Sequence, residues 1–222
     1  MNKKHEHYVV YIGNNENAKS FKPKNKTIEQ LLSNVKTYED KKFVSVLYKE
    51  SKKWSKKLTN KQKHAIRKYT KNSLESSHIP MKNRFYYQLN SFTEGDYRSL
   101  TKPKELYEKY IKEISEAINK FQINESFVAF RGSDDEEFIG EVGDVIKKKR
   151  FLSSSIDPDK AFNKKYKIVI ITKPNARCAF LGKLSRIPRQ KEVLFDINIE
   201  FKIMKKEENT TYVRVLKWLL KN

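Results

Sequence analysis

Three short segments of the sequence carry side chains that could act together on a glycosidic bond. The last of them is Gln190-Lys-Glu192, where a strand entered after Pro188 would place the amide and the carboxylate on one face, because alternate residues of a strand share a face. A carboxylate can stabilise a developing positive charge and accept a hydrogen bond from a sugar hydroxyl, while an amide can orient a polar nucleophile. The pair indicates glycosyl transfer, although Gln-x-Glu is also common on exposed strands.

The first segment is a buried apolar strand that ends in Arg131 and Gly132. An arginine at a strand end can direct its planar fork of donors toward a phosphate or a ribose, and a glycine lets a ligand approach closely. The alternative is a structural salt bridge from Arg131 to Asp134, Asp135 or Glu136.

The second segment is a predicted strand that ends in Ser153, Ser154 and Ser155 before a turn at Asp157-Pro158. Hydroxyl groups at this place can hold a carboxylate in one rotamer. Ordinary use of serine at a strand end is the alternative interpretation.

The order of the three segments resembles the Arg, Ser-Thr-Ser, Gln/Glu-x-Glu signature of mono-ADP-ribosyltransferase toxins. Because Gln190 opens the last motif, the chain resembles the C3-like exoenzymes in particular. The helix predicted to end in Tyr69-Thr70 is also similar to an early helix of that family, and the resemblance extends over residues 45–222.

The resemblance implies a catalytic role for each matching residue. Glu192 would hydrogen-bond the nicotinamide-ribose 2′-hydroxyl and stabilise the oxocarbenium ion, and Gln190 would orient the acceptor, an asparagine in the C3-like group. Arg131 would hold the phosphates and ribose of NAD, and Ser153 would position Glu192. NAD is then a substrate, no metal is required, and the enzyme is a glycosyltransferase of the pentosyltransferase class.

The resemblance implies further contacts with NAD. Phe162 would pack on the nicotinamide end, and Lys165 would bind a phosphate where these toxins often have an arginine. Gly132 and Tyr69 match family positions near the dinucleotide, and Ser154 replaces the usual threonine.

The acceptor is expected to be a protein, either a Rho-type small GTPase or a host protein. In C3-like enzymes an exposed aromatic residue before the Gln-x-Glu motif contacts Rho, whereas the turn here reads Ser185-Arg-Ile-Pro-Arg. The alternative is a phage- or bacterium-encoded transferase that acts on a bacterial host protein or on nucleic acid.

A net charge of +21 gives the 222-residue chain a strongly positive field, which attracts nucleic acid, anionic membranes, acidic proteins or a phosphate-bearing substrate. A competing hypothesis is therefore a nucleic-acid-binding protein without catalysis, which would use the lysine-rich helix around residues 52–71. The single cysteine, Cys178, excludes an internal disulfide, and with only four histidines a zinc site is not expected.

The predicted helices precede the predicted strands, and this segregation favours an α+β fold. A capping box at Thr59-Asn-Lys-Gln62 starts one helix, and an apolar stripe from Leu106 to Phe121 follows Pro103 in another. The resemblance implies an ADP-ribosyltransferase-like fold, in which N-terminal helices pack on two antiparallel β-sheets that flank an NAD cleft. We expect an extension at residues 1–44 and one catalytic domain at 45–222.

The sequence shows no signal peptide, and no apolar run is long enough for a membrane span. We expect a soluble protein that acts in the cytosol of a target or host cell.

Overall fold

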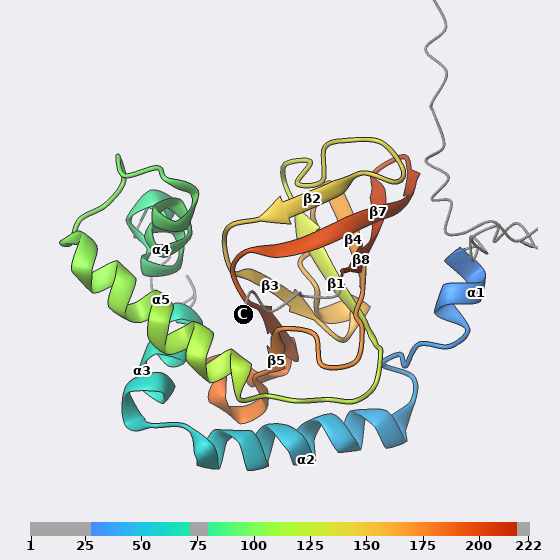
Figure 1. Cartoon of the computed structure of the whole chain (residues 1–222), viewed down its shortest axis with the longest axis horizontal. Coiled ribbons are helices and arrows are strands. Elements are labelled where there is room, and N and C mark those ends of the chain that lie inside the picture. Colours follow the sequence, from blue (N-terminus) through green and yellow to red (C-terminus); the bar gives the residue numbers. More distant parts are fainter. Residues whose placement is uncertain (1–27, 72–79, 217–222) are drawn as a thin grey trace, which may run out of the picture.

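The computed structural model describes residues 28–71 and 80–216, and in this part of the chain the helices come before the strands (Figure 1). The α-helices are α1 (Ile28–Leu32), α2 (Lys41–Lys57), α3 (Asn60–Tyr69), α4 (Phe85–Glu94) and α5 (Lys104–Asn119). The predicted α+β class is confirmed. No helix among these residues has the length and apolar character that crossing a membrane demands.

The described strands form one sheet of eight in the order β2-β7-β8-β4-β1-β3-β6-β5. Their bounds are β1 (Val128–Ser133), β2 (Val145–Lys148), β3 (Leu152–Ser155), β4 (Tyr166–Ile171), β5 (Cys178–Phe180), β6 (Glu192–Phe195), β7 (Ile199–Glu207) and β8 (Thr210–Val215).

This topology differs in two ways from the expected pair of antiparallel sheets. First, β4 and β8 run parallel, because the long excursion through β5, β6 and β7 brings the chain back beside β4 in the same direction. Second, all eight strands belong to one continuous sheet, in which β1 and β3 share a single registered pair, Phe130 with Ser155. The sheet therefore consists of five strands and three strands joined at one narrow point.

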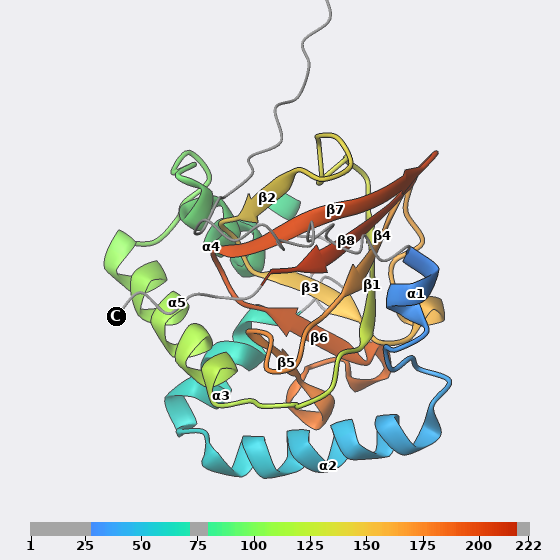
Figure 2. The same cartoon turned by 45° about the vertical axis from the view of Figure 1, so that its right-hand side comes forward.

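Helix α2 lies along one edge of the fold because one of its faces is apolar (Figure 2). The side chain of Asp40 caps its first turn by accepting a hydrogen bond from the backbone N–H of Phe43 (2.9 Å). Phe43, Leu47 and Trp54 are buried, and the Trp54 indole donates to the carbonyl of Ala117 in α5 (2.7 Å). The α2 and α5 helices are thereby fixed to each other.

The predicted capping box of α3 is present. The Thr59 hydroxyl accepts from the backbone N–H of Gln62 (3.1 Å), and the Gln62 side chain accepts from the backbone N–H of Thr59 (3.2 Å). The helix runs to the buried Tyr69, which brings its C-terminus beside the strands that carry the candidate site.

Candidate active site

A pocket lies at the narrow junction between β1 and β3. Strands that share only one paired position leave room between their ends, and side chains from β1, β3 and β6 line that space. The lining includes six of the eight residues to which the resemblance gave a catalytic or NAD-binding role: Arg131, Gly132, Ser153, Phe162, Gln190 and Glu192.

Glu192 is the first residue of β6, and its carboxylate is buried beneath the pocket. It accepts hydrogen bonds from the hydroxyls of Ser153 (2.6 Å) and Ser185 (3.0 Å). Burial raises the pKa of Glu192, while these two hydrogen bonds oppose the rise. The predicted contact with Ser153 is therefore present, and Ser185 is a second partner of the carboxylate that the sequence did not reveal.

Gln190 and Glu192 reach the same pocket by a route that differs from the expected one. Instead of entering a strand after Pro188, the chain forms the 3-10 turn η4 (Pro188–Gln190), and β6 begins only at Glu192. Lys191 between them has a positive φ of 49°, a conformation that breaks the strand alternation. The amide is thus presented by a turn and the carboxylate by a strand.

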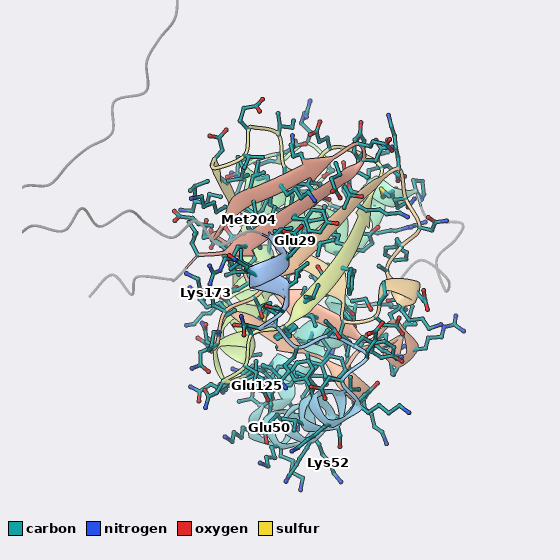
Figure 3. The ribbon with its side chains drawn as sticks, turned by 90° about the vertical axis from the view of Figure 1, so that its right-hand side faces the viewer. Glu29, Glu50, Lys52, Glu125, Lys173 and Met204 are labelled. Atoms are coloured by element: carbon teal, nitrogen blue, oxygen red, sulfur yellow. The ribbon has the colours of Figure 1, made fainter. Side chains whose placement is uncertain are left out.

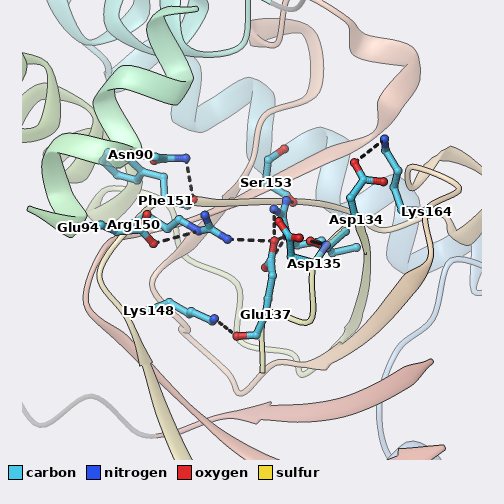
Figure 4. Close-up of polar contacts among 12 residues, drawn as sticks. Asn90, Glu94, Asp134, Asp135, Glu137, Lys148, Arg150, Phe151, Ser153 and Lys164 are labelled. Carbon is cyan, nitrogen blue, oxygen red and sulfur yellow. Dashed lines mark hydrogen bonds and ion pairs between the residues drawn. The ribbon is translucent and has the colours of Figure 1, made fainter. Parts of the chain in front are cut away.

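Arg131 makes its ion pair with a residue other than the three expected partners. Its Nε and Nη2 donate to the two carboxylate oxygens of Glu137 (3.0 and 2.7 Å), and its Nη1 donates to the carbonyl of Ser153 (2.7 Å). Glu137 exposes only 4% of its side-chain surface, whereas Asp134 and Glu136 pair with lysines at the exposed side of the loop. The loop therefore turns Glu137 inward, while Asp134 pairs with Lys164 on the outer side (Figure 4).

Glu137 is the centre of a buried charge network. Arg150 approaches the same carboxylate (Nη2–Oε1, 3.0 Å) and also contacts Glu94 of α4, while Lys148 donates to the Glu137 backbone carbonyl. Burial would raise the pKa of Glu137, but the charges of Arg131 and Arg150 and the hydrogen bonds outweigh it and hold the pKa at about 2. This carboxylate stays ionised and fixes Arg131 at the pocket.

Gly132 is required by a close approach of the chain. A Cβ atom on this residue would lie 1.8 Å from the backbone oxygen of Phe162. The loop that follows the turn η2 (Pro158–Lys160) therefore packs directly on β1 and presents the Phe162 ring, which is 52% exposed, at the rim of the pocket.

Two of the predicted NAD contacts lie outside the residues that line this pocket. The Lys165 side chain is exposed and stands over the Tyr166 ring, and Lys160 of η2 is the lysine at the pocket wall. Tyr69 is buried, accepts a hydrogen bond from Asn90 (3.2 Å) and packs edge-on against Phe151. Its place beside the β3 strand makes it a supporting residue of the wall.

Within residues 28–71 and 80–216, no group of three or more histidine, cysteine, aspartate or glutamate side chains is placed to hold a metal ion.

The sequence profile of the ADP-ribosyltransferase exoenzyme family matches residues 47–221. Because this match covers most of the chain, the protein belongs to that family and is an NAD-dependent ADP-ribosyltransferase, as its motifs predicted. No curated protein sequence matches the chain.

Several solved structures share the fold. Plx2a, an ADP-ribosyltransferase toxin from Paenibacillus larvae, superimposes with a TM-score of 0.60 at 18% identity, over 82% of this chain and 98% of its own. C3stau2 from S. aureus, solved with NAD, superimposes with a TM-score of 0.62 at 17% identity, over 83% of this chain and 99% of its own. The toxin BECa of C. perfringens, solved with NADH, superimposes with a TM-score of 0.63 at 17% identity, and the match spans 82% of the present chain but only 50% of BECa.

Proposed function

We propose that the protein transfers ADP-ribose from NAD to an asparagine side chain of a protein acceptor, in the manner of the C3-like exoenzymes. The observation that carries this proposal is the buried Glu192 carboxylate, held by two serine hydroxyls in the same pocket as Arg131 and Gln190. Such a carboxylate is oriented before substrate arrives, and preorganised charge is the main source of transition-state stabilisation in many enzymes.

The pocket walls suit the different parts of NAD. Of the five N–H groups of Arg131, three donate to Glu137 and Ser153 among the described residues, so the outer edge of its guanidinium retains donors for a phosphate or a ribose. Lys160 adds a positive charge at the same wall, and the exposed Phe162 ring offers a flat surface for nicotinamide. The structures of C3stau2 with NAD and BECa with NADH support a dinucleotide at this place in the fold.

In the proposed reaction the bond between ribose C1′ and the nicotinamide nitrogen breaks, and its electron pair neutralises the pyridinium as nicotinamide leaves. The positive charge that develops on the ribose lies next to Glu192. The amide nitrogen of the acceptor then attacks C1′ and releases a proton. Gln190, which stands at the pocket edge, would hydrogen-bond the acceptor amide and aim its nitrogen at C1′.

The acceptor would meet the protein at the turn before Gln190. This turn presents Pro188 and Arg189 to solvent, where a C3-like enzyme would present an aromatic side chain to Rho. A small GTPase remains one proposed acceptor and a host protein with acidic groups around the modified asparagine is the other. The proposed catalytic domain spans residues 45–222, and the end of the preceding 1–44 extension, which includes the start of α2, packs against it. The proposed site of action is the cytosol of the target cell.

Labelling with biotinylated NAD tests the proposal. The protein is incubated with NAD and candidate cell lysates, and the modified residue is mapped by mass spectrometry, with Glu192→Ala as the control. We expect labelled asparagine and no label with the variant. Label found only on arginine, or on nucleic acid, would contradict the assignment of Gln190 as a selector of asparagine.

A further inference from the structure

The side chain of Lys191 points away from the pocket although its two neighbours line it. The residue has a positive φ of 49°, which is unfavourable for a residue with a Cβ atom, and its side chain is only 18% exposed. Its Nζ donates to Oδ2 of Asp157 (2.8 Å) and to the Tyr38 hydroxyl. An unfavourable backbone conformation persists where surrounding contacts enforce it. At Lys191 these two side-chain contacts act beside two main-chain hydrogen bonds, from its own N–H to the Pro188 carbonyl (3.1 Å) and from the Ile156 N–H to its carbonyl (3.2 Å).

Tyr38 comes from a part of the chain that the family profile leaves out. The profile begins at residue 47, whereas Tyr38 lies in the short connection between α1 and α2. This connection is fixed to the start of β1, because Lys36 and Phe127 form a parallel bridge: the Lys36 N–H donates to Ser126 (2.9 Å), and its carbonyl accepts from Val128 (3.0 Å). The connection that contains Tyr38 is therefore anchored to the start of β1, the strand that carries Arg131.

Asp157 starts the η2 turn, and this turn leads to the residues Lys160 and Phe162 of the pocket wall. Its carboxylate is buried and caps η2 by accepting from the N–H of Asp159 (3.0 Å), while its own N–H donates to the Ser155 hydroxyl (3.0 Å). The η2 turn carries Lys160 and leads to Phe162. The ion pair with Lys191 therefore joins the turn that presents Gln190 to the loop that presents these two residues.

We propose that Tyr38, Asp157 and Lys191 form a clamp behind the pocket that holds the η4 turn and the η2 loop at a fixed separation around NAD. Lys191 is then a positioning residue, and the segment that carries Tyr38 is part of the catalytic unit although it lies outside the family profile. The kinetic part of this inference rests on the proposed function, whereas the structural part does not.

The Glu192 carboxylate does not contact the clamp, because it is held by Ser153 of β3 and by Ser185, which follows the 3-10 turn Gly182–Leu184. Loss of the clamp should therefore loosen the walls that contact NAD while the fold and the Glu192 carboxylate stay in place. This separates a positioning role from a purely structural one.

Hydrogen exchange on the full chain tests the structural part. Lys191→Met removes the charge and keeps most of the stem. Lys53→Met removes an ion pair of similar length but exposed to solvent, to Glu50 at 2.7 Å, on the outer face of α2. We expect about tenfold faster amide exchange in residues 158–162 and 186–190 for Lys191→Met only, because a segment opens more readily once the ion pair that holds it is removed. Unchanged exchange in both segments would overturn the clamp whether or not the protein uses NAD.

Hydrolysis of NAD tests the kinetic part on the same variants. We expect Lys191→Met to lower kcat/KM about tenfold, mainly through KM, because displaced binding groups weaken NAD binding. Lys191→Arg should recover most of this loss, and Lys53→Met should match the wild type. A Lys191→Met variant with wild-type kcat/KM, or an arginine variant as poor as the methionine one, would refute the positioning role.

Tyr38→Phe keeps the ring and removes only the hydroxyl, so it also serves if Lys191→Met does not fold. We expect about threefold lower kcat/KM with an unchanged unfolding midpoint, and no further loss when it is added to Lys191→Met, because the two act through one contact. Additive effects, or no effect of Tyr38→Phe, would remove Tyr38 from the clamp. If the wild type does not hydrolyse NAD at all, the proposed function fails while the exchange result still decides the clamp.

Discussion

At the scale of single residues, the site and its supporting network contain two buried glutamates, Glu192 and Glu137, whose pKa values are shifted in opposite directions. Burial raises the pKa of Glu192, whose partners among the described residues are the hydroxyls of Ser153 and Ser185, whereas two guanidiniums hold the pKa of Glu137 at about 2. Glu137 is therefore ionised at neutral pH and fixes Arg131. Glu192 is a carboxylate whose negative charge becomes most stabilised when a cation forms beside it, as in the departure of nicotinamide.

This contrast predicts the acid limb of the pH profile. Only ionised Glu192 can stabilise the oxocarbenium ion, so kcat/KM for NAD hydrolysis should fall as the pH drops through its raised pKa. Ser185→Ala removes a hydrogen bond that lowers that pKa, so the limb should move to higher pH. Ser55→Ala on α2, whose hydroxyl bonds the Lys52 carbonyl in its own helix, is the control. A limb that moves to lower pH in Ser185→Ala would contradict this arrangement.

Glu137→Gln should destabilise the fold, because it leaves Arg131 and Arg150 facing a neutral group. Breaking a buried ion pair on one side costs about 3 kcal/mol, which urea unfolding at pH 7 can measure. The folded-state pKa is depressed from 4.5 to about 2, so this stabilisation is present above pH 4.5 and disappears as the pH falls toward 2. Glu136→Gln, in an exposed pair with Lys206, should have little effect. Equal stability of the two variants at pH 7 would be incompatible with the network.

At the scale of elements, the site exists because β1 and β3 separate after one paired position, and the η2 loop and the η4 turn cover the opening. The α+β class, the α3 capping box and the apolar stripe of α5 could be predicted, because each depends on residues close in sequence. The order of three motifs also predicted that Arg131, Ser153 and Glu192 would share a pocket. The alternation of polar and apolar residues did not predict the η4 turn, because the positive φ of Lys191 that ends this turn is not visible in the sequence pattern.

Tertiary contacts explain what the sequence did not reveal. Ser185 and Glu137 look like ordinary turn and surface residues, and they acquire their roles only from side chains that are distant in sequence or turned inward by a loop. The continuous sheet and its parallel β4–β8 pair were also missed, because strand order is set by long connections and not by strand composition.

Gly132→Ala tests the contact between elements that closes the pocket. The added methyl group would collide with the Phe162 backbone, and backbone cannot yield as a side chain can, so the loop must move. We expect at least tenfold lower kcat/KM for NAD hydrolysis. Gly95→Ala is the control, because a positive φ of 84° makes alanine unfavourable there by about 1 kcal/mol while no atom lies within 4 Å of the new Cβ. That variant should lose stability and keep its activity per folded molecule; similar kinetic losses in both would show that the contact is not specific to the site.

At the scale of the whole molecule, the positive charge is spread over surfaces that the pocket does not use. Helix α2 alone carries seven lysines and one glutamate, and Figure 3 shows Lys52 and Glu50 directed away from the sheet. These lysines give the chain a general attraction for anions, which explains why composition also suggested nucleic acid.

Reversing charges on α2 separates catalysis from a general attraction for anions. We expect Lys52→Glu combined with Lys56→Glu to leave kcat/KM for NAD hydrolysis within about twofold of the wild type, because exposed charges outside the site act only through a screened field. Any binding of RNA, measured by filter retention at rising salt, should weaken in the same variant. A tenfold loss of NAD hydrolysis would mean that α2 contributes to the site.

The most direct test of the central claim is nicotinamide release from NAD by the wild type and by Glu192→Gln. Glutamine keeps the size of the side chain and removes its charge, so the pocket should still bind NAD and raise the melting temperature. We predict that kcat for nicotinamide release falls at least about a hundredfold in the variant, as removal of one preorganised electrostatic group does in other enzymes. Equal rates for the two proteins, or no release by the wild type, would contradict the assignment of this pocket as the centre of ADP-ribosyl transfer.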